Sequence, residues 1–71
     1  MQDVRQDTPT VPIDDQVLCV KREIRFRERV YPRWVSEARM TKAEADHQLA
    51  VMRAVLATLE QLREQQRPGL F

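Results

Sequence analysis

Apolar residues recur at helical spacing in two long stretches of the chain, one on each side of the segment around Pro32. In the second stretch the apolar residues are separated by intervals of four and three. These intervals place side chains on one side of an α-helix, so the pattern predicts a long helix here. The positions on this stripe are Ala45, Leu49, Met52, Leu56 and Leu59.

The ends of this long helix are marked in the sequence. Thr41 and Glu44 have the spacing of a capping box, in which each side chain hydrogen-bonds the backbone of the other residue. Arg67-Pro68-Gly69 is a typical stop signal. We therefore expect a helix from Lys42 to about Gln66, roughly 25 residues and about 37 Å long at about 1.5 Å per residue.

The first stretch predicts another helix, from about Asp15 to Tyr31. Asp14 is suited to cap its N-terminus, and Asp15 favours the positive end of the helix dipole. Four apolar side chains fall within about 60° of one another on a helical wheel and predict the face that enters the core. They are Val17, Val20, Ile24 and Tyr31.

Pro32 predicts a change in this helix. Proline has no N–H and its ring clashes with the carbonyl four residues earlier, so the chain is expected to kink or break at Tyr31-Pro32. Because proline suits the first turn of a helix, a short helix from Pro32 to Arg39 is expected to turn the chain, with Trp34 near the connecting end.

Together these elements predict an all-α protein: an antiparallel helical hairpin with a Pro-kinked first helix. Residues 1–13 are expected to be a flexible or extended arm, 14–67 a single helical domain and 68–71 a tail. The apolar arc of the long helix spans about 160°, more than one partner helix covers, so the kinked end of the first helix or a second copy of the chain must cover the rest. We expect a homodimer. The predicted dimer or core residues are Leu49, Met52, Val55, Leu56, Leu59 and Leu62.

Composition excludes several classes of function. The 71 residues include one Gly and one Cys, so phosphate-binding loops, internal disulfides and zinc sites are not expected. A hairpin of this size has little volume for an active site, and we predict no enzyme, no cofactor and no metal site. His47 is expected to be a surface residue and Cys19 a packing residue. With no apolar run long enough to span a membrane and no signal-peptide pattern, a cytoplasmic location in the host cell is expected.

The strongest polar feature is the segment 21–33, which has six basic residues against two glutamates. Arg22, Arg25 and Arg29 share one arc of the helix. Such an arc is able to grip phosphates, with Tyr31 and Trp34 offering faces for base stacking. Alternatively it is a solvated face paired with acidic residues of the long helix or of a partner, and Asp46, Glu60 and Glu64 are the candidates on the long helix.

Protein recognition is the preferred hypothesis for this surface, and nucleic-acid binding is the second. The formal net charge is only +1 and the pI about 8.0, below the pI of about 9 that marks many nucleic-acid-binding domains. Arginine and aromatic residues are enriched at the centres of protein interfaces. The other possibility is that Tyr31, Trp34 and Met40 only close the end of the hairpin. The predicted partner-binding residues are Arg22, Arg25, Phe26, Arg29, Arg33 and Trp34.

The segments 27–35, 39–41 and 50–55 resemble a family of short phage and prophage proteins with the pattern R-x-x-V-Y-P-x-x-V, an R/K-M pair and an Ala- and Glu-rich helix. The resemblance covers roughly residues 18–60. Family members commonly have glycine where this chain has Ala38, which puts a left-handed turn at this position in doubt. The resemblance implies a small accessory protein that binds, and sometimes inhibits, a host macromolecule. It implies no catalytic or ligand-binding residue.

Overall fold

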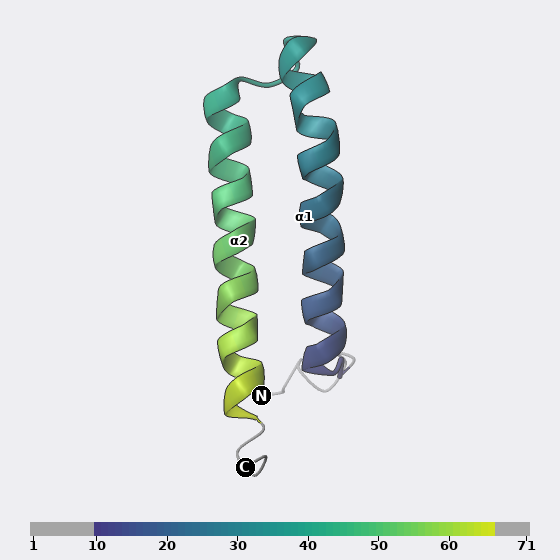
Figure 1. Cartoon of the computed structure of the whole chain (residues 1–71), viewed down its shortest axis with the longest axis vertical. Coiled ribbons are helices and arrows are strands. Elements are labelled where there is room, and N and C mark those ends of the chain that lie inside the picture. The colour runs from purple at the N-terminus through teal and green to yellow at the C-terminus, as the bar shows by residue number, and fades with distance from the viewer. Residues whose placement is uncertain (1–9, 67–71) are drawn as a thin grey trace, which may run out of the picture.

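The computed structural model describes residues 10–66, which fold into two α-helices that pack side by side (Figure 1). Helix α1 comprises Ile13–Ser36 and helix α2 comprises Lys42–Gln65. The chain turns back after α1, and the two helices are antiparallel (Figure 1). The predicted all-α helical hairpin is confirmed.

Helix α1 begins two residues earlier than predicted, with Pro12 rather than Asp14 at the N-cap position. The carbonyl of Pro12 accepts hydrogen bonds from the backbone N–H groups of Asp15 and Gln16, at 3.1 and 3.2 Å. Proline loses nothing at a helix start, because an N–H there has no partner within the helix. Asp14 therefore lies inside the first turn, where its charge still favours the positive end of the helix.

The prediction of a separate short helix after Tyr31 is wrong, because α1 continues through Pro32 to Ser36. Proline removes one N–H donor, yet the side chains on both sides of it hold the helix in place. Tyr31 is buried and Trp34 is half-buried, and the centres of their rings lie 5.7 Å apart. Pro32 itself is exposed, so its ring displaces no core side chain.

The turn between the helices closes α1 with a Schellman motif, in which two backbone N–H groups reach back to carbonyls of the last helical turn. Ala38 donates a hydrogen bond to the carbonyl of Val35 at 3.0 Å, and Arg39 donates to the carbonyl of Trp34 at 2.8 Å. This geometry requires a left-handed residue, and Ala38 has a φ of 60°. The left-handed turn that alanine put in doubt is therefore present, and an L-residue with a Cβ adopts it.

Helix α2 begins with the predicted capping box. The hydroxyl of Thr41 accepts a hydrogen bond from the backbone N–H of Glu44 at 3.0 Å, and a carboxylate oxygen of Glu44 accepts from the N–H of Thr41 at 2.8 Å. The helix ends at Gln65, one residue before the predicted end. The predicted stop signal at 67–69, the tail at 68–71 and most of the predicted N-terminal arm lie outside the described residues.

The core lies along the line where the helices meet. Val17, Ile24 and Tyr31 are buried at successive heptad positions of α1, and Ala45 is buried in α2. The other predicted core residues on the same faces are half-buried: Val20, Leu49, Met52, Leu56 and Leu59. In the part of the chain that the structure describes, neither helix is long and apolar enough to cross a membrane.

Candidate partner-binding surfaces

The two helices form ion pairs with each other along one side of the hairpin, which we call the charged side. The Nζ of Lys21 lies 3.8 Å from Oε2 of Glu60, and Nη2 of Arg53 lies 2.6 Å from Oε2 of Glu28. Near the open end, Asp14 and Arg63 lie 3.7 Å apart. Exposed pairs of this kind contribute less than about 1 kcal/mol each, but together they favour one register of the two helices.

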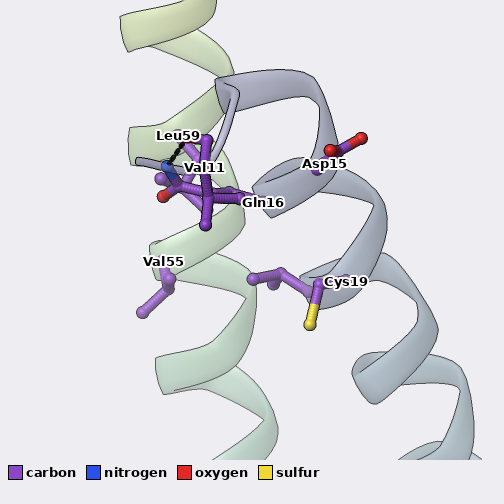
Figure 2. A pocket seen from close by; sticks show the side chains of 7 residues that line it. Val11, Asp15, Gln16, Cys19, Val55 and Leu59 are labelled. Atoms are coloured by element: carbon purple, nitrogen blue, oxygen red, sulfur yellow. Dashed lines mark hydrogen bonds between the residues drawn. The ribbon is translucent and has the colours of Figure 1, made fainter. Parts of the chain in front are cut away.

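The opposite side of the hairpin is apolar. A groove of about 540 Å³ runs between the helices there and is lined by Cys19 and Val20 of α1 and by Val55 and Leu59 of α2. Val11 and Gln16 lie across one end, where the Gln16 amide donates a hydrogen bond to the Val11 carbonyl at 2.9 Å (Figure 2). The carboxylate of Asp15 points away from the groove (Figure 2).

A second hollow continues this groove along α2. It has a volume of about 340 Å³, and Val51, Ala54 and Thr58 line it together with Val55 and Leu59. Helical spacing extends the surface further, because Leu62 lies seven residues from Val55 and Val30 lies eleven from Cys19. We call this surface the apolar side and define it by Cys19, Val30, Val51, Val55 and Leu62.

Side chains of the apolar side are exposed to an unusual degree for their size. Val51, Val55 and Leu62 retain 43%, 40% and 42% of their accessible surface. Val55 and Leu62 are among the predicted dimer or core residues, and the single chain does not bury them in its core. The other four of that prediction face α1: Leu49, Met52, Leu56 and Leu59.

A row of arginines follows the outward face of α1. Arg22, Arg25, Arg29 and Arg33 are separated by three, four and four residues, which aligns them on one stripe of the helix. All four are exposed, and none forms an ion pair with another residue in the 10–66 range. We call these four residues the arginine row.

Two of the three acidic residues that are the expected partners of this row pair elsewhere, and the third, Glu64, forms no ion pair within residues 10–66. Asp46 pairs with Lys42 at 3.1 Å within α2, and Glu60 pairs with Lys21. Both contacts lie away from the arginine row, because α2 packs against the opposite face of α1. Within the described residues, the row is therefore a solvated positive surface that the hairpin does not neutralise.

Phe26 borders the arginine row and is 42% exposed. The guanidinium of Arg29 lies 5.6 Å from the centre of its ring. At this separation the cation is attracted to the face of the ring. Leu18 also lies on this face and is 58% exposed. The structure thus brings five of the six predicted partner-binding residues onto or beside one face of α1.

Trp34, the sixth predicted partner-binding residue, lies off this face. It is half-buried beside Tyr31, and the guanidinium of Arg39 covers its ring at 5.1 Å. This placement agrees with the alternative in which Tyr31 and Trp34 close the end of the hairpin. Met40 is half-buried in the same turn.

Arg27 differs from the arginine row because it points along the edge of the core. Its Nε donates a hydrogen bond to the Glu23 carboxylate at 2.7 Å, one helical turn away. This hydrogen bond raises the pKa of the Arg27 guanidinium, although partial burial acts in the opposite direction. Arg27 therefore stays charged and paired, and it is not available to a partner in the way that the row is.

Residues that carry chemistry are scattered over the hairpin. His47 is exposed on α2, as predicted, whereas Cys19 is exposed with a free thiol and is not the packing residue that the sequence predicts. In residues 10–66, no three His, Cys, Asp or Glu side chains come together in a way that would hold a metal ion. The geometry instead offers surfaces, one apolar and one basic.

Sequence reasoning missed the Schellman motif and the pairing along the charged side. A capping signal for the motif was absent, because alanine stands at the position where glycine usually announces it. The ion pairs of the charged side join residues 25 to 49 positions apart, and charge alternation within one helix does not reveal them.

Comparison with known proteins found no match. No protein family, no curated protein and no solved structure matches this chain. The resemblance to short phage proteins therefore stays a prediction.

Proposed function

We propose that this protein is a non-enzymatic binding protein of the phage accessory type, which binds and inhibits a host protein through the outward face of α1. The observation that carries this proposal is the arginine row. Its four residues span about 17 Å of helix at about 1.5 Å per residue. No carboxylate in residues 10–66 neutralises their guanidinium groups.

A protein partner suits the apolar residues that lie beside the row. Leu18 and Phe26 are exposed there and would gain contacts in a protein interface. In such interfaces aromatic and arginine side chains commonly supply most of the binding energy. The partner would present carboxylates opposite the arginines, which bind carboxylates through two parallel hydrogen bonds. An amphipathic acidic helix or an acidic groove has this chemistry.

Nucleic acid is the second candidate partner, and the spacing of the row favours it. Arginines that follow one another along a helix are able to contact successive phosphates of one strand. Binding of this kind loses affinity steeply as salt is added, because each phosphate contact releases a counterion. The formal net charge of +1 makes this candidate the weaker one.

We further propose that the protein acts in the host cytoplasm as a homodimer. The width of the apolar arc on α2 supports the homodimer, because α1 leaves Val51, Val55 and Leu62 largely exposed. Each dimer would carry two arginine rows, one on each copy, and so two binding sites for the partner.

Capture from a bacterial lysate with matched variants tests the proposal. The first variant combines Arg25→Gln and Arg29→Gln, and the control combines Lys42→Gln and Arg53→Gln on α2. Each pair removes two positive charges, so both variants change the formal net charge from +1 to −1. We expect the unaltered chain and the control to capture one host protein in similar amounts. We expect the Arg25/Arg29 variant to capture at least tenfold less of that protein.

Nuclease treatment distinguishes a protein partner from a nucleic-acid partner. A capture that resists nuclease supports the protein partner, whereas a capture that nuclease abolishes overturns it in favour of nucleic acid. Equal capture by the Arg25/Arg29 variant and the control overturns any role of the arginine row.

A further inference from the structure

We infer that the apolar side of the hairpin binds the same side of a second copy of the chain, which makes a four-helix dimer with both arginine rows on its outer surface. This inference rests on the homodimer of the proposed function and deepens it by naming the interface. Cys19, Val30, Val51, Val55 and Leu62 would lie between the two copies.

Charged and apolar side chains are divided between the two sides of the hairpin. The three ion pairs between α1 and α2 lie on the charged side, where they face solvent. On the apolar side Cys19 and Val20 of α1 line the groove together with Val55 and Leu59 of α2, and the second hollow continues it along α2. Glu23 and Arg27 lie on this side of α1, between Cys19 and Val30 along the helix, and pair with each other at 2.7 Å. A dimer through the apolar side would therefore bury this ion pair as a pair and would not strand either charge alone.

The area of the apolar side is close to that of a stable dimer interface. Each helix has 24 residues. Such a helix is about 36 Å long, and two packed helices are about 20 Å wide, so one side of the hairpin offers roughly 700 Å². A standard stable interface buries about 800 Å² on each partner. The whole side of the hairpin is thus close to the size that a specific dimer needs.

The core between the two helices is small. Within residues 10–66 only Val17, Ile24, Tyr31 and Ala45 are buried. Small domains usually need metals, disulfides or association to supplement such a core. The one cysteine of this chain forms no disulfide within it. A second copy would bury the three aliphatic side chains of α2 that retain 40% to 43% of their surface.

The positions of the arginine rows allow a second copy to dock on this side without repulsion between like charges. Two identical chains repel each other where unpaired like charges meet. The arginine row lies on the face of α1 that points away from α2, and helical spacing displaces Arg22 and Arg29 from the groove toward the outside of the hairpin. Docking through the apolar side therefore keeps the two positive rows on opposite surfaces of the dimer. A two-fold axis would then let each copy offer the same residues to the other.

Light scattering after size exclusion tests the interface with a matched pair of variants. Val55→Glu places a charge on the apolar side, and Ala57→Glu places the same charge two residues away on an exposed position of α2 that turns from the groove. For the unaltered chain and for Ala57→Glu we expect twice the 8.4 kDa of one chain, at low and at moderate salt. For Val55→Glu we expect the mass of one chain at the same concentration, with the affinity of the dimer weakened at least 100-fold.

Thiol labelling keeps the inference testable if Val55→Glu fails to fold. Cys19 is the only cysteine and lines the groove, so its reaction with Ellman's reagent reports on the apolar side of the unaltered chain. We expect labelling to slow several-fold as protein concentration rises through the dimer range. A single-chain mass at all concentrations overturns the inference, and so does a dimer whose Cys19 labels equally fast at every concentration.

The same measurements separate this inference from the proposed function. The Arg25/Arg29 variant is expected to stay dimeric while it loses partner capture. If the unaltered chain is monomeric and still captures its partner through the arginine row, the interface is wrong and the proposed host-protein binding stands.

Discussion

Arg39 closes the first helix by contacting Trp34 twice, once through the backbone and once through the side chain. Its backbone N–H donates to the Trp34 carbonyl at 2.8 Å, and its guanidinium lies 5.1 Å from the centre of a Trp34 ring. In many Schellman motifs an apolar residue fills the place of Arg39. Here a cation covers the aromatic ring and keeps the end of the hairpin in contact with water.

Replacing Arg39 with alanine should destabilise the hairpin by about 0.5 to 1 kcal/mol, because an exposed cation–π contact contributes about that much. Trp34 is the only tryptophan, so its fluorescence reports directly on the contact. We expect a red-shifted emission in Arg39→Ala. Arg39→Lys, which keeps a cation, should retain much of the stability, and an unchanged emission in Arg39→Ala would show that the guanidinium does not cover the ring.

Replacing Ala38 with glycine should stabilise the protein by about 1 kcal/mol, because Ala38 is left-handed. An L-residue in this conformation costs about 1 to about 2 kcal/mol, and the greater freedom of glycine in the unfolded chain offsets part of the gain. Urea denaturation measures the change. Ala50→Gly, at an exposed position inside α2, is the control and should destabilise by about 1 kcal/mol. Equal losses in both variants would contradict the left-handed turn.

Two neighbouring residues of α1 should differ sharply in their contribution to stability. Val17 is fully buried, whereas Leu18 keeps 58% of its surface exposed. Val17→Ala should cost about 2 kcal/mol in the free energy of unfolding. Leu18→Ala removes more carbon but should cost less than about 0.5 kcal/mol, because the leucine side chain is already largely in water. Thermal unfolding followed by circular dichroism compares the two. A larger loss for Leu18→Ala would mean that the wrong face of α1 packs on α2.

Loss of the Thr41 hydroxyl should destabilise α2 by about 1 kcal/mol, because the backbone N–H of Glu44 then lacks its partner. Thr41→Ala tests this, and Thr41→Ser, which keeps the hydroxyl, should differ little from the unaltered chain. Hydrogen exchange at the first turn of α2 locates the effect. Protection there should fall in Thr41→Ala and not in Thr41→Ser.

Much of the fold could be predicted because local signals agreed with one another. The capping box at Thr41 and the stripe from Ala45 to Leu59 both indicated α2, and its observed bounds differ from the prediction by one residue. Pro32 misled the prediction because proline disfavours the helix interior on local grounds, whereas packing of Tyr31 and Trp34 holds α1 together across it. Helix α1 begins two residues before the predicted start because Pro12 occupies the N-cap position, although Asp14 has the better side chain for that position.

For the candidate surfaces, the sequence by itself determined which residues share a helical face, since that depends only on the spacing of residues along the chain. It grouped Arg22, Arg25 and Arg29, and it separated them from the stripe that enters the core. Only the tertiary structure decided what each face meets, because the ion pairs of the charged side join residues that are distant in sequence. These ion pairs leave the charged side of the hairpin exposed to water with its charges paired. They leave three aliphatic side chains of α2 exposed on the other side, and the arginine row without a partner in residues 10–66.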